Sequence, residues 1–305
     1  MKNILVPVDF SEVSEAAAQF AIDLAKKKKA SITLLNSTPM SFVGDYPFPT
    51  YSGADVWRDE VITSIINQMA RMIEDLETES IQIQSKVSSL GLVPAILDQI
   101  KKEEVDLVVM GTNGASGLDE FLIGSNTEKV VRQVHCPVIS VPSSTSVDDI
   151  NKILIPIDLR EIRSSFLLEI AGLQDFFNCE LEFLWVKTPH NVENEEKVTQ
   201  ELSLIFKKHG IEDYRFIIVR SVFPGDGILM ETDASGANMV AMATHARRGI
   251  SHWLSGSLSE DTINHVHVPV WTFKINRNEE VIALKSSEAV GDIPAYRKIE
   301  PMVYQ

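Results

Sequence analysis

One stretch in the first half of the chain has the residue types and spacing of a phosphate-binding element. It reads Gly111, two residues, Gly114, nine residues, and then Gly124-Ser125-Asn126-Thr127. Glycine lets the backbone approach an anion closely and adopt positive φ angles. Free N–H groups at a helix N-terminus can then donate hydrogen bonds to phosphate oxygens. The spacing therefore predicts a site for a phosphorylated ligand.

The residues on either side of this stretch predict the elements that would position it. The apolar run 105–110 is typical of a buried strand, and residues 126–134 have the pattern of a helix. A strand, a glycine loop and a helix N-terminus in this order direct several N–H groups toward one point.

The chain contains two copies of one unit. The segment ending in Val8-Asp9 recurs as the segment ending in Ile157-Asp158, and Met110-Gly111 recurs as Met242-Ala243. The offset between the copies falls from 149 to 132, so the second copy is shorter in its middle. We expect the missing piece to correspond to part of residues 38–59.

This repeat sets the expected domain boundaries. We predict a first domain over residues 1–142, a second over 151–273, and a C-terminal tail over 274–305 that has no counterpart in the first copy. The polar stretch 143–149 suits a linker.

Strand-like runs alternate with amphipathic helices within each copy. In the first copy we expect strands at 4–8, 32–36, 81–87, 105–110 and 138–141, and helices after a cap at Ser11 and at 61–76, 93–101 and 126–134. This alternation predicts an α/β fold with right-handed crossovers and a parallel sheet that is covered on both faces. Ligands bind such sheets at the carboxyl ends of strands, where the strand order reverses. If the first and fourth strands are neighbours, one crevice contains Asp9 and Gly111.

The composition excludes some partners. The net charge is −15 and the pI is about 4.9, which argues against nucleic acid or an anionic membrane as the main partner. No apolar run approaches the roughly 20 residues that span a bilayer. The two cysteines, Cys136 and Cys179, lie at non-equivalent positions of the repeat, so we expect buried thiols and a cytoplasmic protein.

These features together resemble the universal stress protein family in its tandem-domain form. The features that match are the strand end Pro7-Val8-Asp9, the glycine pattern that ends in Gly124-Ser125, and Pro137-Val138 at the start of the last strand. The resemblance covers both copies and leaves out the tail. It implies two doubly wound, Rossmann-like domains of the adenine nucleotide alpha-hydrolase-like type, each with a five-stranded parallel sheet. It also implies pairing of the domains about a pseudo-two-fold through their last strands.

For members with intact glycines, the resemblance implies ATP binding, with Mg²⁺, AMP and ADP left open. The position after the second strand, usually Val in the family, is Ser37 here. The implied contacts are Pro7, Val8, Asp9 and Ser37 for adenine and ribose, Met110 and Gly111 beside the ribose, and Gly114, Gly124, Ser125, Asn126 and Thr127 for the phosphates. Asp9 suits a ribose hydroxyl or an adenine edge. It could also cap the following helix, and the two roles can coexist.

The second copy departs from the pattern at two of three glycines. Ala243 and Ala246 replace them, and each methyl group adds bulk where a phosphate would approach. Arg247 and Arg248 could offset this by binding phosphate or could form a solvated loop. Copy two keeps Val186, the usual family residue. We expect nucleotide to bind mainly in the first domain.

The sequence predicts no catalytic residue and no metal site. It has no Walker-type lysine and no nucleophile elbow. Four histidines, His245, His252, His265 and His267, cluster without an acidic or thiolate partner. Three functions stay open: an ATP-binding stress-response regulator or binding module, a protein-interaction platform without nucleotide, and a slow ATPase. An unknown protein partner and a homodimer beyond the intrachain pair are further expectations.

Overall fold

The computed structural model describes residues 1–39, 53–76, 81–112, 125–142, 145–244, 267–275, 278–284 and 296–298. The chain divides into two compact units, Met1–Val147 and Asp148–Gln305, which we call domain 1 and domain 2. A search of the described helices found none long and apolar enough to cross a membrane.

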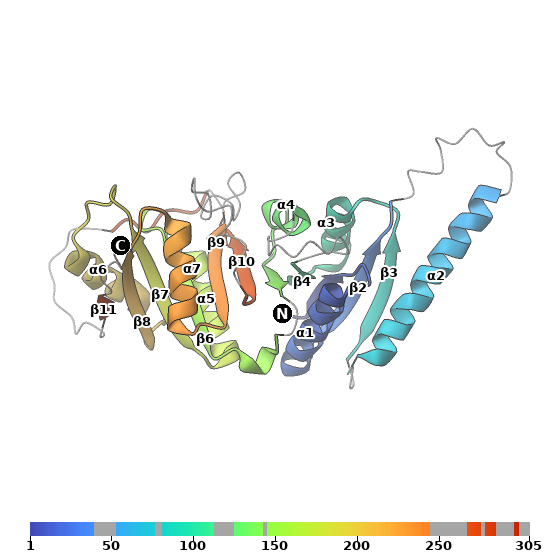
Figure 1. Ribbon diagram of the computed structural model, residues 1–305, viewed down its shortest axis with the longest axis horizontal. Helices are drawn as coiled ribbons and strands as arrows, with labels where there is room; N and C mark the ends of the chain where they lie inside the picture. The colour runs from blue at the N-terminus through green and yellow to red at the C-terminus, as the bar shows by residue number, and fades with distance from the viewer. Residues whose placement is uncertain are drawn as a thin grey trace, which may run out of the picture. The chain divides into compact units, whose positions relative to one another are not determined.

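Domain 1 alternates strands and helices along the chain (Figure 1). The strands are β1 (Asn3–Pro7), β2 (Ser31–Ser37), β3 (Ile83–Ser88), β4 (Leu107–Gly111) and β5 (Val138–Val141), and the helices are α1 (Glu12–Lys28), α2 (Gly53–Asp75), α3 (Leu92–Glu103) and α4 (Ser125–Gln133). All neighbouring strands are parallel, in the order β3-β2-β1-β4-β5. The predicted five-stranded parallel sheet is confirmed, and its order reverses between β1 and β4.

Helix α1 lies close to the sheet because small residues line its inner face. Ala17, Ala21 and Ala25 are fully buried, beside Phe20 and Leu24 at 1% exposure. The helix begins at the predicted cap, where the side chain of Ser11 accepts a hydrogen bond from the Ser14 N–H group. It ends in three lysines, which suit the negative end of the helix dipole.

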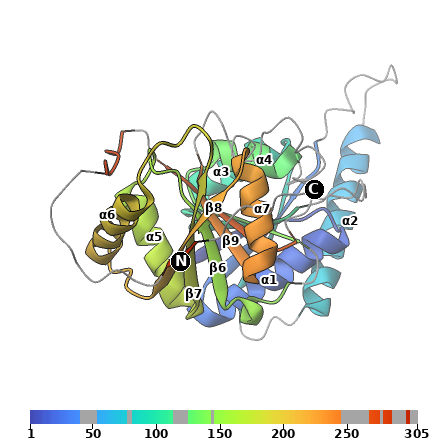
Figure 2. The ribbon, with the colours of Figure 1, turned by 60° about the vertical axis from the view of Figure 1, so that its left-hand side comes forward.

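Within its described residues, domain 2 repeats the strand order of domain 1 and adds one strand; residues 245–266, between β9 and β10, lie outside the described residues. Its elements are β6 (Lys152–Pro156), α5 (Ser164–Phe177), β7 (Glu180–Lys187), α6 (Glu195–Lys208), β8 (Tyr214–Arg220), α7 (Pro224–Ser235), β9 (Met239–Thr244), β10 (Val270–Lys274) and β11 (Tyr296–Lys298). The strand order is β11-β8-β7-β6-β9-β10. Helices α5 and α6 lie on one face of this sheet and α7 on the other (Figure 2).

The added strand comes from the tail, which the repeat pattern left unassigned. Strand β11 pairs in parallel with β8, with Tyr296 opposite Phe216. The five strands of the repeat are therefore present in domain 2, and the tail contributes a sixth at the β8 edge.

One helix boundary differs from the prediction by about two turns, whereas the bounds of α3 and α4 agree within two residues. Helix α2 begins at Gly53, whereas the apolar periodicity predicted a start at residue 61. Its first two turns carry several charged residues, so they show no apolar stripe from which a helix could be recognised. Helix α6 has 14 residues and α2 has 23, so part of the missing piece of copy two is helical.

Candidate functional site

The carboxyl edge of domain 1 brings the ends of β1 and β4 together. Leu5 of β1 is paired with Val108 of β4, so these strands are neighbours at the reversal of strand order. Asp9 follows β1, Thr112 follows β4, and α4 begins at Ser125. The predicted crevice residues Asp9 and Gly111 therefore lie at the same edge of the sheet.

Asp9 supports the start of α1 and stays accessible. Its Oδ1 accepts hydrogen bonds from the backbone N–H group of Ser11 at 3.1 Å and from the Ser11 hydroxyl at 2.5 Å. Phe10 between them has a φ of 64°, in the left-handed region. Ser11 is the cap itself, so Asp9 orients the capping residue. Asp9 is exposed, which leaves it within reach of a ligand.

The end of β2 is tied to Val8 by a residue that sequence reasoning missed. Asn36 is 5% exposed, and its side-chain Nδ2 donates to the carbonyl oxygen of Val8 at 2.9 Å. The Thr38 hydroxyl in turn donates to Asn36 Oδ1 at 2.7 Å. The only signal in the sequence is a polar residue at the end of an apolar strand. This network fixes the chain at Val8, directly before Asp9.

Ser37 has a structural partner in domain 1. Its hydroxyl donates to the carbonyl oxygen of Leu90 at 2.8 Å, which ties β2 to the connection between β3 and α3. In domain 2 the counterpart is Val186, at the end of β7, which packs against Gly227 of α7. A Cβ atom placed on Gly227, in the first turn of α7, would lie 2.7 Å from a Val186 methyl group. The departure from Val to Ser thus exchanges an apolar contact for a hydrogen bond.

Gly111 has a packing role that the family resemblance did not suggest. A Cβ atom at this position would lie 2.8 Å from the carbonyl oxygen of Val13, in the first turn of α1. The absence of a side chain lets α1 approach the end of β4. In domain 2, Ala243 stands at the equivalent position, and α5 begins only at Ser164, after Ile162, the counterpart of Val13. Helix α5 thus starts later than α1, in the domain where alanine replaces the glycine.

The first turn of α4 is joined to the end of β4. The hydroxyl of Thr127, a residue that is 1% exposed, donates to the carbonyl oxygen of Gly111 at 3.4 Å. Asn126 is exposed, and Met110 is 5% exposed. Thr127 therefore uses its hydroxyl to position the helix. Gly114 and Gly124 lie outside the described residues, so their contacts with phosphate stay a prediction.

Thr112 is a further polar residue at this edge. Its N–H group donates to the carbonyl oxygen of Val141 at 3.2 Å, which continues the pairing of β4 with β5. Its hydroxyl oxygen is buried and has no hydrogen-bond partner within the described part of the chain. A buried hydroxyl usually has a partner.

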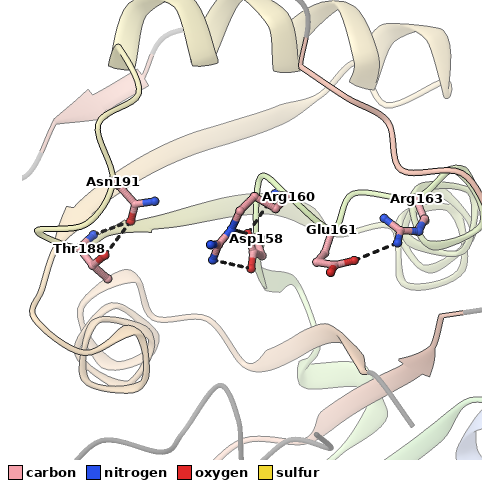
Figure 3. Close-up of polar contacts among 6 residues, drawn as sticks. All are labelled: Asp158, Arg160, Glu161, Arg163, Thr188 and Asn191. Atoms are coloured by element: carbon pink, nitrogen blue, oxygen red, sulfur yellow. Dashed lines mark hydrogen bonds and ion pairs between the residues drawn. The ribbon is translucent and has the colours of Figure 1, made fainter. Parts of the chain in front are cut away.

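The equivalent edge of domain 2 has a different charge arrangement (Figure 3). Asp158 Oδ1 accepts from the Arg160 N–H group at 3.0 Å and from the guanidinium Nε at 3.2 Å, and Oδ2 accepts from Nη2 at 3.3 Å. The hydrogen bond and charge of Asp158 raise the pKa of Arg160. Arg160 occupies the position of Ser11, so the carboxylate that is exposed in domain 1 is paired with a cation in domain 2.

A cavity of about 390 Å³ lies at the ends of β7 and β8 in domain 2, lined by residues from 187–191 and 220–222. Two cationic side chains that line it, Lys187 and Arg220, share one carboxylate. Glu195 Oε1 accepts from Lys187 Nζ at 3.2 Å and from Arg220 Nη2 at 2.6 Å. Burial acts to raise the pKa of Glu195, but these two hydrogen bonds outweigh it and the pKa lies below its ordinary value. Asp158 and β9 do not line this cavity.

The remaining candidate residues take part in no described site. His267 is exposed, and His245, His252 and His265 lie outside the described residues. Within the described ranges, no three His, Cys, Asp or Glu side chains come together as metal ligands. Cys136 and Cys179 are free thiols, and burial raises the pKa of each to about 11.

Comparison with known proteins establishes the class of this protein. The model of the universal stress protein family matches residues 1–142 and 150–274. The chain belongs to the universal stress protein family, with two of its domains in tandem.

Individual relatives agree with this assignment. Universal stress protein MJ0531 of Methanocaldococcus jannaschii is 32% identical over 147 residues, which are 46% of this chain and 81% of the relative. Universal stress protein Rv2005c of Mycobacterium tuberculosis is 24% identical over 88% of this chain and 95% of its own length. The crystal structure of a universal stress protein from Archaeoglobus fulgidus DSM 4304 superimposes with a TM-score of 0.65 at 20% identity, over 89% of this chain and 98% of that one. This likeness supports the fold.

Proposed function

We propose that domain 1 binds an adenine nucleotide, with ATP as the expected ligand. The observation that carries this proposal is the meeting of β1 and β4 at the reversal of strand order, with exposed Asp9 at one strand end and the N-terminus of α4 following the other. Such crevices are where open α/β sheets bind their ligands. The glycine pattern of residues 111–124 and the family membership support a phosphorylated ligand.

The residues at this edge suit different parts of the ligand. The carboxylate of Asp9 can accept a hydrogen bond from a ribose hydroxyl or an adenine amino group. The N–H groups at the start of α4, at Ser125 and Asn126, can donate to phosphate oxygens, and the helix dipole favours the negative charge there. Pro7, Val8, Met110 and Ser37 would form the walls around the base and ribose. Gly114, Gly124 and the backbone N–H group of Thr127, whose hydroxyl is bonded to Gly111, would complete the phosphate contacts.

Domain 2 is proposed to bind nucleotide more weakly. Arg160 already neutralises Asp158, and a ligand hydroxyl would compete with a bidentate guanidinium. Ala243 and Ala246 add methyl groups at two positions that are glycine in domain 1.

We further propose that ATP binding orders the glycine loop and shifts the surface that a protein partner recognises, in a cytoplasmic stress-response role. A ligand that binds one conformation more tightly shifts the population toward it. A bound nucleotide would act here as a regulator.

A pair of matched variants tests the proposal. ATP is titrated by calorimetry against the wild type, Asp9→Asn and Asp158→Asn. Asparagine keeps an oxygen that can accept from Ser11, so the start of α1 is retained. Loss of a charge-assisted hydrogen bond predicts about 10- to 100-fold weaker ATP binding in Asp9→Asn, and a change of less than about twofold in Asp158→Asn. The reverse order would place the nucleotide in domain 2, and no binding by the wild type would overturn the proposal.

A further inference from the structure

The cavity at the ends of β7 and β8 has the size of a small-ligand site. Its volume of about 390 Å³ falls within the roughly 300–1,000 Å³ that is usual for such sites. The described residues that line it come from the connections after β7 and after β8, and neither Asp158 nor Val186 is among them. A molecule of about 10–15 non-hydrogen atoms would fill it, since one water takes about 30 Å³ in the liquid.

The walls of the cavity are mostly apolar. Pro189 and Val222 line it, and both are exposed, with 65% of the Val222 surface accessible. Val192, on the same connection as Pro189, is 92% accessible. Covering such side chains with an apolar body removes them from water, which is favourable. The ligand that fits these walls therefore has an apolar part.

Two polar side chains of the cavity have unused hydrogen-bond donors. Asn191 Oδ1 accepts from the N–H group and from the hydroxyl of Thr188, each at 2.9 Å, which directs the amide nitrogen Nδ2 away from Thr188 (Figure 3). Arg220 donates to Glu195 through Nη2. Within the described part of the chain, neither Nδ2 of Asn191 nor Nε and Nη1 of Arg220 makes a hydrogen bond.

The charge of the cavity favours an anion. Its described lining contains two cations and no acidic side chain. Lys187 and Arg220 share the one carboxylate of Glu195, so one positive charge is left over. The ammonium of Lys187 is also held by the carbonyl oxygen of Glu193 at 3.0 Å, and the Glu193 carboxylate acts on Arg160, beyond the end of β6. Arg220 is thus the cation with donors available to a ligand.

These cations are particular to domain 2. The strand registers place Thr38 and Ser89 of domain 1 at the positions of Lys187 and Arg220. A requirement of the shared fold would apply to both copies of the repeat. The cations therefore belong to a feature that domain 1 does not have.

We propose that this cavity binds a small organic carboxylate with an apolar body. The carboxylate accepts from the guanidinium of Arg220 and from Nδ2 of Asn191, and the apolar body lies against Pro189 and Val222. One excess positive charge and two neighbouring donor groups match the single charge and the two oxygens of a carboxylate. Glu195 competes with the ligand for Arg220. Binding here does not depend on nucleotide binding by domain 1.

Calorimetric titration of the full chain with phenylacetate tests the site. Phenylacetate has an aromatic body and one carboxylate. Phenylacetamide is the matched probe without the charge, and acetate is the probe without the apolar body. We expect phenylacetate to bind at least about 10-fold more tightly than either. Equal binding of phenylacetate and phenylacetamide would overturn the proposal, as would the absence of phenylacetate binding by the wild type.

Three variants, each titrated well below its thermal unfolding midpoint, locate the binding. Arg220→Gln and Asn191→Asp should each weaken phenylacetate binding at least about 10-fold. Aspartate keeps the oxygen that accepts from Thr188 but replaces the Nδ2 donor with a charged oxygen. Arg215→Gln is the matched control, because Arg215 lies on the same strand, has 62% of its side chain exposed and pairs with Glu180. It is about 17 Å from Arg220 along the strand, beyond the screening length, so binding should stay within about twofold.

Glu195→Gln should change the affinity in the opposite direction. Loss of the competing carboxylate frees the guanidinium of Arg220, so we expect phenylacetate to bind about 3- to 10-fold more tightly. A purely structural role of Arg220 predicts no such gain. Unchanged or weaker binding in Glu195→Gln, or equal binding by Arg220→Gln and Arg215→Gln, would show that the cavity is not a carboxylate site.

Discussion

Asp9 and Asp158 stand at the same position of the repeat but have different partners. Asp9 orients a neutral serine, whereas both oxygens of Asp158 accept from Arg160. Arg160 is largely exposed, with 77% of its side-chain surface accessible, so this ion pair contributes little to stability. Its main effect is on charge, because the Arg160 guanidinium neutralises the Asp158 carboxylate in domain 2.

Gly111 gives a prediction at the scale of one residue. In Gly111→Ala, the new methyl group must displace the backbone of Val13, a contact at 2.8 Å that cannot relax by a side-chain rotation. Overpacking of this kind predicts a loss of about 1–3 kcal/mol from the free energy of unfolding of domain 1. Urea denaturation, monitored by hydrogen exchange in each domain, measures this loss of free energy of unfolding.

The reciprocal change Ala243→Gly is the control for this prediction. It removes a methyl group at a position where α5 starts later, so we expect a loss of no more than about 1 kcal/mol from domain 2. A Gly111→Ala protein as stable as the wild type would show that α1 does not need the glycine.

Glu195 joins α6 to the ends of two strands, and its charge makes domain 2 sensitive to acid. Because the pKa of Glu195 is lowered in the folded protein, its contribution to stability is present above the unfolded pKa and is lost as the pH falls through the folded value. We expect Glu195→Gln to lower the free energy of unfolding of domain 2 by about 1 kcal/mol at pH 7, with the difference shrinking below pH 4. Thermal unfolding across this pH range measures the difference. Glu196→Gln, at an exposed neighbour, should show no such dependence.

At the scale of elements, two glycines in domain 2 helices have opposite surroundings. A Cβ atom on Gly227 would meet both Val186 methyl groups, at 2.7 and 2.9 Å, whereas one on Gly172 in α5 would meet nothing within 4 Å. Helix α7 therefore needs its glycine to lie against the end of β7, and α5 does not.

Alanine at these two positions should move the stability of domain 2 in opposite directions. Gly172→Ala should raise the free energy of unfolding by about 0.5–1 kcal/mol, because alanine is the better helix former. Gly227→Ala should lower it by about 1–3 kcal/mol through overpacking. Chemical denaturation measures both values, and two changes of the same sign would contradict the close packing of α7 against Val186.

At the scale of the whole molecule, the elements that recur in both copies could be predicted from the sequence, whereas contacts between residues far apart in the chain could not. The central strands β1, β4, β6 and β9 are short apolar runs because they are buried on both faces of a parallel sheet, and this pattern can be read directly. The pairing of the first strand with the fourth, which places Asp9 beside β4, is a condition that the sequence leaves open and that the structure supplies. The pairing of the domains about a pseudo-two-fold and a further homodimer stay predictions.

Three features could not be predicted because no local pattern encodes them. The role of Gly111 depends on Val13, far earlier in the chain, and the buried bond of Asn36 depends on the carbonyl oxygen of Val8. Glu279 caps a helix that begins 115 residues before it, and the tail it belongs to has no copy in domain 1 for comparison. In each case the two partners come together only once the sheet has folded.

A crystal structure of the full chain grown with ATP and Mg²⁺ would show which domain binds the nucleotide. We expect one nucleotide at the ends of β1 and β4, with its ribose or base hydrogen-bonded to Asp9 and its phosphates at the start of α4. A nucleotide found only at the edge beside Asp158 and Arg160, or a domain 1 edge closed by its own side chains with no nucleotide bound, would contradict this expectation.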